Sequence, residues 1–347
     1  MYTSTPSSVS GFLDLSSDTA TRPSDAMRAF TAHAPVGDDQ RGEDPTVNAL
    51  QAEAAVLLGK KAALFVPSAT MANQIAIRVH TRPGDEVYCH ENAHIRIYEG
   101  GAPSALSGVQ LCPLPGARGG FTAQVLASAL RPDDPHYARP RLVCLENTHN
   151  HNGGTVLRRA EVAAVAHDHR LALHLDGARL LNAAVRLGTP AAELCAPFDS
   201  VTLCLSKGLG APGGAILTGS VDFMHEAIRW RKIFGGAMRQ AGVLAAGGLY
   251  GLRHNVERLA DDHRNAARLA ESLAQIPGVR LDPAPETNLV FVDVSGLHMS
   301  GEEAQTRLLA AGVRCSGGGS RLRFVTHLDV SATDIETVIT AARSAWA

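Results

Sequence analysis

One lysine of this chain stands where covalent chemistry is possible. Lys207 follows the hydrophobic segment 200–205 and precedes a turn rich in glycine and proline, 208–214. A strand normally ends at such a turn, where a side chain can face a cavity. A lysine that is desolvated on one side presents a neutral amine more readily, and that amine can form a Schiff base with a carbonyl group.

An aspartate at the end of a second apolar segment provides a partner for this lysine. Asp176 ends the run 171–175 and precedes Lys207 by 31 residues. The cofactor pyridoxal phosphate (PLP) needs both residue types, a carboxylate at its pyridine nitrogen and a lysine at its aldehyde. A Ser-Lys-Gly segment alone is usually only a turn, but the two residues on successive strand ends favour a PLP site.

Small residues at the start of an expected helix offer a place for the phosphate of such a cofactor. The segment 67–73, Pro-Ser-Ala-Thr-Met-Ala-Asn, leaves an apolar strand and opens a helix, where backbone N–H groups are free to bind an anion. Ser68 and Thr70 add hydroxyl donors. Alone the segment is a plain helix N-cap; beside Lys207 and Asp176 it predicts a phosphate site.

Strands and helices are expected to alternate around these residues, which is typical of parallel strands joined by helices. The predicted strands are 62–67, 86–89, 109–113, 141–146, 172–176, 200–205 and 214–218. Predicted helices between them include 45–58, 72–80 and 161–169. The carboxyl edge of such a sheet is where ligands bind.

From about residue 254 the pattern changes to a smaller α+β unit. A helix over 256–275 leads to a strand over 288–294, and two further helices are predicted to start at Ser300-x-x-Glu303 and Ser331-x-x-Asp334. A strand over 322–325 lies between those two helices. We therefore expect an α/β fold, with a large domain over 1–253 that has a mainly parallel sheet and a small C-terminal α+β domain over 254–347.

Composition excludes several classes of function. The net charge of −2 gives no electrostatic footprint for nucleic acid or an anionic membrane, and no apolar run is long enough to span a bilayer. The first ten residues lack the basic and apolar parts of a signal peptide. The six cysteines form no Cys-x-x-Cys pair, so we predict no metal site and a reduced, cytoplasmic protein.

Nine segments in the right order make the chain resemble the low-specificity L-threonine aldolases, PLP enzymes of fold type I (the aspartate-aminotransferase-like fold) in the β-eliminating lyase superfamily. The segments are 15–23, 36–39, 42–48, 67–73, 145–150, 176–179, 205–210, 229–232 and 325–331. They extend through nearly the whole chain. The resemblance implies reversible cleavage of L-threonine, L-allo-threonine and related β-hydroxy-α-amino acids to glycine and an aldehyde. It also implies a cytoplasmic homotetramer built as a dimer of dimers.

The resemblance assigns roles at the cofactor. Lys207 would bind the PLP aldehyde, Asp176 the pyridine nitrogen, and Ser68, Ala69 and Thr70 the phosphate. His94, 24 residues after Thr70, would stack on the ring. His94, His136 or a water that they hold would take the proton of the substrate's β-hydroxyl, although the segment around His136 also has the composition of a solvated turn.

Arginines are expected at the substrate's α-carboxylate, which they bind by a planar two-point contact. The resemblance puts Arg179 and Arg323 there, with Ser17 as a further donor. Arg321 would share a strand face with Arg323, and only the offset of Arg323 from His327 favours it. Lys232 and Arg239 are implied as nearby basic groups, Lys232 acting through water and Arg239 reaching the cofactor phosphate of a neighbouring subunit.

The chain departs from the family pattern at Arg41, where many relatives have a tyrosine. Arg41 either reaches the carboxylate side of the substrate pocket or points into solvent and pairs with Asp38, Asp39 or Glu43. Other PLP enzymes of fold type I, such as β-eliminating lyases and aminotransferases, share the Asp–Lys pair and are the nearest alternatives. A PLP-binding regulatory module is the alternative from another class.

Overall fold

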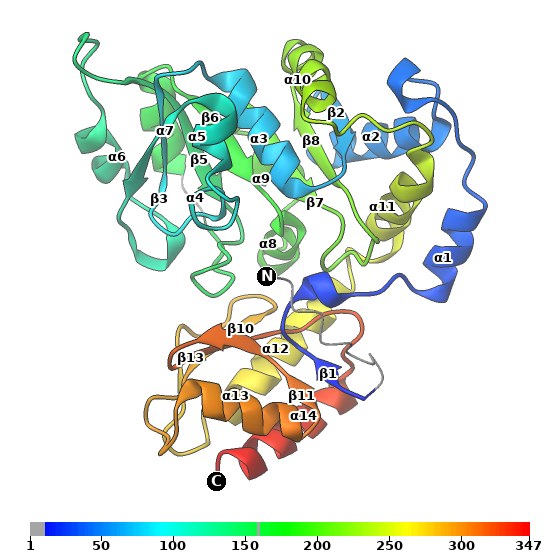
Figure 1. Ribbon diagram of the computed structural model, residues 1–347, viewed down its shortest axis with the longest axis vertical. Helices are drawn as coiled ribbons and strands as arrows, with labels where there is room; N and C mark the ends of the chain where they lie inside the picture. Colours follow the sequence, from blue (N-terminus) through cyan, green and yellow to red (C-terminus); the bar gives the residue numbers. More distant parts are fainter. Residues whose placement is uncertain (1–10, 158–159) are drawn as a thin grey trace. The chain divides into compact units, whose positions relative to one another are not determined.

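The computed structural model describes residues 11–157 and 160–347, and they form two compact units. The large unit extends from Thr21 to Ala260, and the small unit joins residues 11–20 to Asp261–Ala347. The first ten residues, in which we expect no signal peptide, lie outside the described part. Figure 1 labels the elements of both units.

A seven-stranded sheet is the centre of the large unit. Its strand order is β2-β8-β7-β6-β5-β3-β4, and only β8 is antiparallel to its neighbours. The strands are β2 (Ala62–Val66), β3 (Asp85–His90), β4 (Gln110–Leu114), β5 (Arg139–Glu146), β6 (Ala172–Asp176), β7 (Ser200–Cys204) and β8 (Ala215–Gly219). All seven predicted strands are present, with ends shifted by at most two residues. The expected mainly parallel sheet is therefore confirmed.

Helices cover both faces of this sheet (Figure 1). The helices are α1 (Asp25–Ala32), α2 (Pro45–Leu57), α3 (Ala69–His80), α4 (His94–Ile97), α5 (Ala102–Ser107), α6 (Ala123–Ala129), α7 (Ala160–Asp168), α8 (Leu180–Leu187), α9 (Ala191–Cys195), α10 (Val221–Ile233) and α11 (Gly242–His254). Helices α3 and α10 pack on one face through apolar residues of β2 and β8. Helices α2, α7, α8 and α9 pack on the other.

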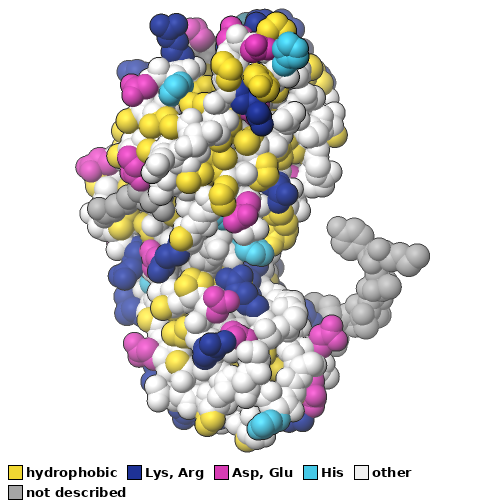
Figure 2. Space-filling model, turned by 90° about the vertical axis from the view of Figure 1, so that its left-hand side faces the viewer, with side chains coloured by type: hydrophobic (Ala, Val, Ile, Leu, Met, Phe, Trp, Pro, Cys, Tyr) yellow, Lys and Arg dark blue, Asp and Glu magenta, His cyan; other side chains and the backbone are white. Residues whose placement is uncertain are grey.

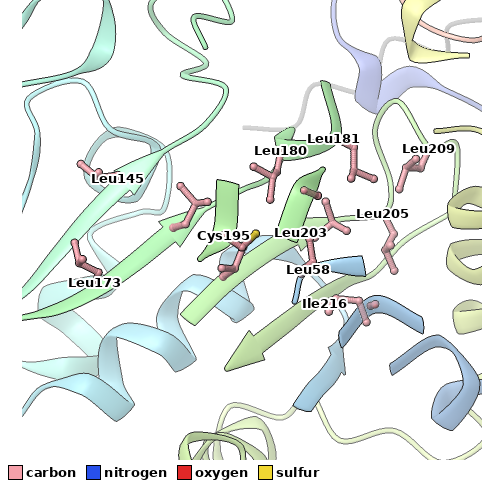
Figure 3. Packing of buried hydrophobic residues seen from close by; sticks show 14 of the residues in the cluster. Leu58, Leu145, Leu173, Leu180, Leu181, Cys195, Leu203, Leu205, Leu209 and Ile216 are labelled. Atoms are coloured by element: carbon pink, nitrogen blue, oxygen red, sulfur yellow. The ribbon is translucent and has the colours of Figure 1, made fainter. Parts of the chain in front are cut away.

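Alternation along the strands divides side chains between these two faces. Leu173 and Leu203 point to the face with α8 and α9, where they pack with Leu180 and Cys195 (Figure 3). The residues next to them along β6 and β7, among them His174 and Thr202, point to the face that α3 covers. One strand therefore supplies both the apolar core and a set of polar side chains.

The small unit has its own core and its own sheet. Strands β9 (Arg280–Leu281), β10 (Leu289–Asp293), β12 (Ser316–Gly318) and β13 (Arg321–Val325) form an antiparallel sheet in the order β12-β13-β10-β9. Helices α12 (Leu259–Leu273), α13 (Gly301–Ala310) and α14 (Ala332–Ala345) contribute to its core. The predicted α+β character of this unit is confirmed.

The division between the units differs from the predicted domains 1–253 and 254–347. Strand β1 (Leu13–Asp14) pairs with β11 (Val313–Arg314), and Leu15 is fully buried in the core of the small unit. Residues 11–20 therefore pack with a segment about 300 positions later in the chain. A strand of two residues has no periodicity that sequence can reveal, and the boundary itself falls inside α12, at Ala260.

The surface carries charges of both signs. On the face shown in Figure 2, lysine and arginine side chains are interspersed with aspartate and glutamate. Within the described residues, no helix has both the length and the apolar composition needed to cross a membrane.

The two predicted capping boxes of the small unit differ. Ser331 and Asp334 cap α14 reciprocally, each side chain accepting the other residue's backbone N–H. Ser300 accepts the N–H of Glu303, but the Glu303 carboxylate pairs with Arg307 at 2.7 Å instead of completing the box. Only the second box is complete.

Removing the complete box should loosen α14. Ser331→Ala leaves backbone donors of the first turn without acceptors, which costs about 1 kcal/mol. We expect faster amide hydrogen exchange in α14 by about fivefold. Thr333→Ala, at an exposed position of the same turn, is the matched control, and equal exchange in the two variants would contradict the capping argument.

Candidate functional site

Strand direction gathers the predicted groups at one edge of the large sheet. Strands β2, β3, β5, β6 and β7 all run the same way, so their carboxyl ends meet there. Asp176 ends β6, Lys207 follows β7, and α3 starts three residues after β2. His94 follows the end of β3. The expected location of the site is thus what the topology dictates.

Lys207 lies in a turn that its own backbone fixes. Its carbonyl oxygen accepts the Gly210 N–H at 2.8 Å and the Thr21 hydroxyl at 3.1 Å. Gly210 has φ 75°, a conformation that favours glycine. The lysine is half-buried and lines a small cavity together with Arg179 and Asn182. A stiff turn therefore presents this amine beside the end of β7.

Asp176 is buried and hydrogen-bonded on both oxygens. It is 4% exposed; Oδ1 accepts the Ala178 N–H at 3.1 Å and Oδ2 accepts Asn73 Nδ2 at 2.9 Å. It pairs with Thr202 in β7 and with Glu146 in β5. A carboxylate held in this way keeps a fixed direction toward any cationic or N–H group of a ligand.

His94 is held by a buried carboxylate that sequence analysis did not identify. Its Nδ1 donates to Glu99 Oε1 at 2.9 Å, and its backbone N–H donates to Glu146 Oε2 at 2.8 Å. Glu99 also accepts from Asn73 Nδ2 at 2.9 Å and from Gln74 Nε2 at 2.6 Å. Burial acts to lower the pKa of His94, but the hydrogen bond to Glu99 and the charge of Asp176 outweigh it and raise that pKa.

Glu146 is a second acidic group that sequence analysis left without a role. Its oxygens accept the N–H groups of His94 and Asn150, at 2.8 and 2.7 Å. Burial, and then the nearby charge of Asp176, raise the pKa of Glu146 to about 7. A carboxyl group with this pKa can gain or release a proton near neutral pH.

The start of α3 has the form that phosphate binding needs. Ser68 is the N-cap and accepts the Met71 N–H at 3.2 Å, and the N–H groups of Ala69 and Thr70 have no partner within the helix by position. The loop after α10 approaches this end closely, since a Cβ on Gly236 would lie 2.2 Å from the Met71 sulfur. The predicted phosphate residues thus stand together at the carboxyl edge.

The predicted basic groups of the large unit have local partners. Lys232 donates to Gln40 Oε1 at 2.9 Å, and Arg239, 62% exposed at its side chain, pairs with Asp38 at 2.9 Å. Arg41 is 73% exposed at its side chain and lies 3.9 Å from the same Asp38 carboxylate. Of the two alternatives for Arg41, the geometry within this chain favours the solvent-facing one.

The predicted carboxylate-binding residues belong to different units. Arg179 is buried in the large unit and donates to Asn150 Oδ1 at 3.2 Å. Ser17 and Arg323 are half-buried in the small unit, Arg323 in β13 between Ser316 and Phe291. Arg321 is instead engaged with the Asp282 carboxylate at 3.0 Å and stacks 3.9 Å above the Phe291 ring.

His136 lies away from the other predicted catalytic residues. It precedes the amino end of β5, its side chain is 87% exposed, and it contacts Asp134 at 2.7 Å. Glu146 lies at the other end of β5, roughly 23 Å from its first residue at about 3.3 Å per residue. Within one chain the structure therefore brings His94, but not His136, to the carboxyl edge, and contact of His136 with a site would need a second copy.

The residues present fit PLP. A half-buried amine, a hydrogen-bonded carboxylate on the adjacent strand and an open helix N-terminus are the three groups that the aldehyde, pyridine nitrogen and phosphate require. Nitrogen and oxygen atoms of His94, Glu99 and Asp176 that could bind a metal ion lie within 4.8 Å of one another. Hydrogen bonds from His94 and Asn73 already occupy these carboxylates, so the cluster serves as a hydrogen-bonded support.

Three residues of this site escaped sequence analysis for different reasons. Glu146 was detectable, because it ends a predicted strand in register with Asp176. Asn73 gave a weaker signal, an amide that is followed by Gln74 between the apolar residues Ala72 and Ile75 of the helix. Glu99 follows the four-residue helix α4 and belongs to no pattern, so only the fold shows its position.

Comparison with known proteins identifies relatives that align with nearly the whole chain. The chain is 44% identical over 333 residues to the low specificity L-threonine aldolase of Escherichia coli, covering 94% of this chain and 97% of that protein. It is 41% identical over 345 residues to low-specificity L-threonine aldolase 1 of Arabidopsis thaliana, covering 96% of each. Among solved structures, a putative L-allo-threonine aldolase of Listeria monocytogenes matches with a TM-score of 0.80, 25% identity and 96% coverage of each chain. The model of the beta-eliminating lyase family matches residues 14–296, and the chain therefore belongs to that family.

Proposed function

We propose that this protein is a PLP-dependent aldehyde-lyase that cleaves L-threonine, L-allo-threonine and related β-hydroxy-α-amino acids to glycine and an aldehyde, reversibly. The observation that carries the proposal is the placement of Lys207 and Asp176 after adjacent parallel strands, beside the open start of α3. The names of the curated relatives, which align over nearly the whole chain, supply the substrate class.

The cofactor site follows from the residues at the carboxyl edge. When bound, PLP withdraws electrons from the α-carbon of the amino acid, so that a bond to that carbon can break. Lys207 provides the amine for the cofactor aldehyde, and Asp176 holds the proton of the pyridine nitrogen. Ser68, Ala69 and Thr70 bind the phosphate, and His94 lies against the ring.

The substrate is oriented through its α-carboxylate. We assign this contact to Arg179 and Arg323, with Ser17 as a further donor, because arginine binds a carboxylate at two points in one plane. By fixing the carboxylate, these residues would determine which bond of the α-carbon is presented for cleavage when the cofactor is bound. Lys232 acts nearby through water in this proposal.

His94 is the group that we assign to the β-hydroxyl proton. Its Nδ1–H is directed to Glu99, which leaves Nε2 as the nitrogen that can accept a proton. The carboxylate stabilises the imidazolium that forms when the proton arrives. His136 is solvent-exposed in this chain, and we propose no role for it at the site of its own chain.

We also propose a cytoplasmic homotetramer. The six free cysteines accord with a reducing compartment. The exposed side chain of Arg239 accords with a role across a subunit boundary, at the cofactor phosphate of a neighbour. Light scattering at assay concentration tests the assembly, and an active monomer would contradict it.

Product analysis tests the proposed reaction. Purified protein loaded with PLP should release acetaldehyde from both L-threonine and L-allo-threonine. Formation of a keto acid and ammonia without acetaldehyde would instead indicate a β-eliminating lyase or an aminotransferase. Binding of PLP without turnover of any amino acid would indicate a regulatory module.

Replacing the lysine should abolish both turnover and the covalent bond to the cofactor. Lys207→Ala removes the amine that follows β7, next to the strand that Asp176 ends, so the visible absorbance of the bound cofactor should change to that of free or non-covalently held PLP. Lys232→Ala is the matched control and should keep the covalent chromophore. Full turnover by Lys207→Ala would refute the assignment.

Replacing Arg323 should weaken substrate binding and leave the cofactor in place. Loss of a charged two-point contact costs about 2–4 kcal/mol, or roughly 30- to 1000-fold in KM or kcat/KM. Arg321→Ala is the matched control on the same strand face, and its contacts with Asp282 and Phe291 predict a loss of stability instead. If the Arg321 variant loses substrate affinity and the Arg323 variant does not, the two roles are exchanged.

The Glu99 carboxylate should control the acid side of the pH profile. Its hydrogen bond raises the pKa of His94, and a base works only when deprotonated, so activity falls as the pH drops through that pKa. Glu99→Gln should lower the His94 pKa and move the acid limb of kcat/KM to lower pH. Glu91→Gln, an exposed charge near the same helix, should leave the limb in place. An unchanged limb in the Glu99 variant would exclude His94 as the base.

A further inference from the structure

Helix α3 buries two amide side chains against the central sheet, where apolar residues would be expected. Asn73 is 1% exposed and Gln74 is 2% exposed, although Ala72 and Ile75 beside them belong to an apolar cluster. Beneath the helix, β6 presents His174 on the same face as Asp176, by strand alternation. The large majority of buried polar side chains are hydrogen-bonded, so partners for these amides are to be expected beneath the helix.

These side chains form a continuous chain of hydrogen bonds that ends at the site. His80 Nε2 lies 2.8 Å from Ser200 Oγ, which lies 2.8 Å from His174 Nδ1. His174 Nε2 lies 3.1 Å from Asn73 Oδ1. Asn73 Nδ2 then donates to Asp176 Oδ2 and to Glu99 Oε1, each at 2.9 Å. One amide group therefore connects the two carboxylates that support the proposed cofactor and His94.

The direction of every bond in this chain follows from its carboxylate end. Two carboxylates accept from Asn73, so its amide nitrogen must face them and its oxygen must face His174. His174 must then carry its proton on Nε2, which leaves Nδ1 as an acceptor for the Ser200 hydroxyl. Ser200 in turn accepts from His80 Nε2–H. Any reversal would point two acceptors at each other.

Both histidines of the chain are uncharged near neutral pH, as this direction requires. Burial, and then the charge of His80, lower the pKa of His174 to about 3. Burial lowers the pKa of His80 to about 4, with Asp199 acting in the opposite sense. The His80 ring is also fixed by stacking on Phe223, with centroids 4.8 Å apart. The far end of the chain is thus anchored by packing.

We propose that Asn73, His174 and Ser200 are positioning residues for the lyase reaction, and that they fix the orientation of Asp176 and Glu99 from between α3 and the sheet. The role of Ser200 acts through His174, and that of His174 through Asn73. The inference rests on the proposed function, because it takes Asp176 as the partner of the pyridine nitrogen and Glu99 as the support of His94.

Breaking the chain at its middle should slow the reaction without weakening substrate binding. Ser200→Ala removes the donor to His174, and we expect kcat to fall about 10-fold while KM changes less than twofold. Ser200→Thr keeps a hydroxyl group and should retain most of the original kcat. Asn73→Ala, next to the carboxylates, should reduce kcat about 10- to 100-fold. Thr218→Val removes another buried hydroxyl, which donates to the Val201 carbonyl at 3.3 Å, and should leave kcat unchanged.

The tautomers of the histidines give a readout independent of turnover. In the PLP-loaded protein with ¹⁵N-labelled histidine, His174 and His80 should both carry the proton on Nε2, and Ser200→Ala should alter the Nδ1 resonance of His174. A His174 proton on Nδ1, or equal kinetic effects of Ser200→Ala and Thr218→Val, would overturn the inference.

Absence of threonine cleavage in the unsubstituted protein would refute the proposed function alone, because the tautomers are measured without a substrate.

Discussion

Three carboxylates, Glu99, Glu146 and Asp176, lie buried close together in the large unit, and burying a carboxylate without donors is expensive. The structure meets this requirement with backbone N–H groups, an imidazole and two amides. The carboxylates fix the position of α3, because the second turn of this helix supplies the donors Asn73 and Gln74. They also fix the position of His94, whose side chain donates to Glu99 and whose backbone N–H donates to Glu146. The site is therefore organised around donors to buried acids.

The same constraint bears on the protonation of Glu146. Glu146 and Asp176 end neighbouring strands in register, so the two carboxylates lie close together. Burial, and then the charge of Asp176, raise the pKa of Glu146 to about 7, against the opposing effect of the N–H groups of Asn150 and His94. Two hydrogen bonds are therefore too few to offset the burial of this carboxyl group, which can exchange a proton near neutral pH.

Sequence predicted the parts of this arrangement that depend on local pattern. Apolar runs ending in turns located all seven strands of the large sheet, and with them Asp176 and Lys207 at its carboxyl edge. It could not predict contacts of segments that have no local pattern: Glu99 follows a helix of one turn, and the two-residue strand β1 pairs with β11, about 300 residues later in the chain. His136 shows a different limit, because a family role was carried to a residue that this chain exposes at the amino end of β5. What sequence alone lacked was the pairing of elements in space.

The two faces of β6 couple the stability of the large unit to its chemistry. Leu173 and Leu175 pack into the core on one face, while His174 and Asp176 meet α3 on the other. Since side chains alternate strictly along a strand, a register shift of one residue would put both polar groups into the core and both leucines under α3. The apolar packing therefore excludes this shift and keeps Asp176 and His174 on the face where Asn73 lies. In this protein the core and the hydrogen bonds together specify the geometry of the hydrogen-bonded chain.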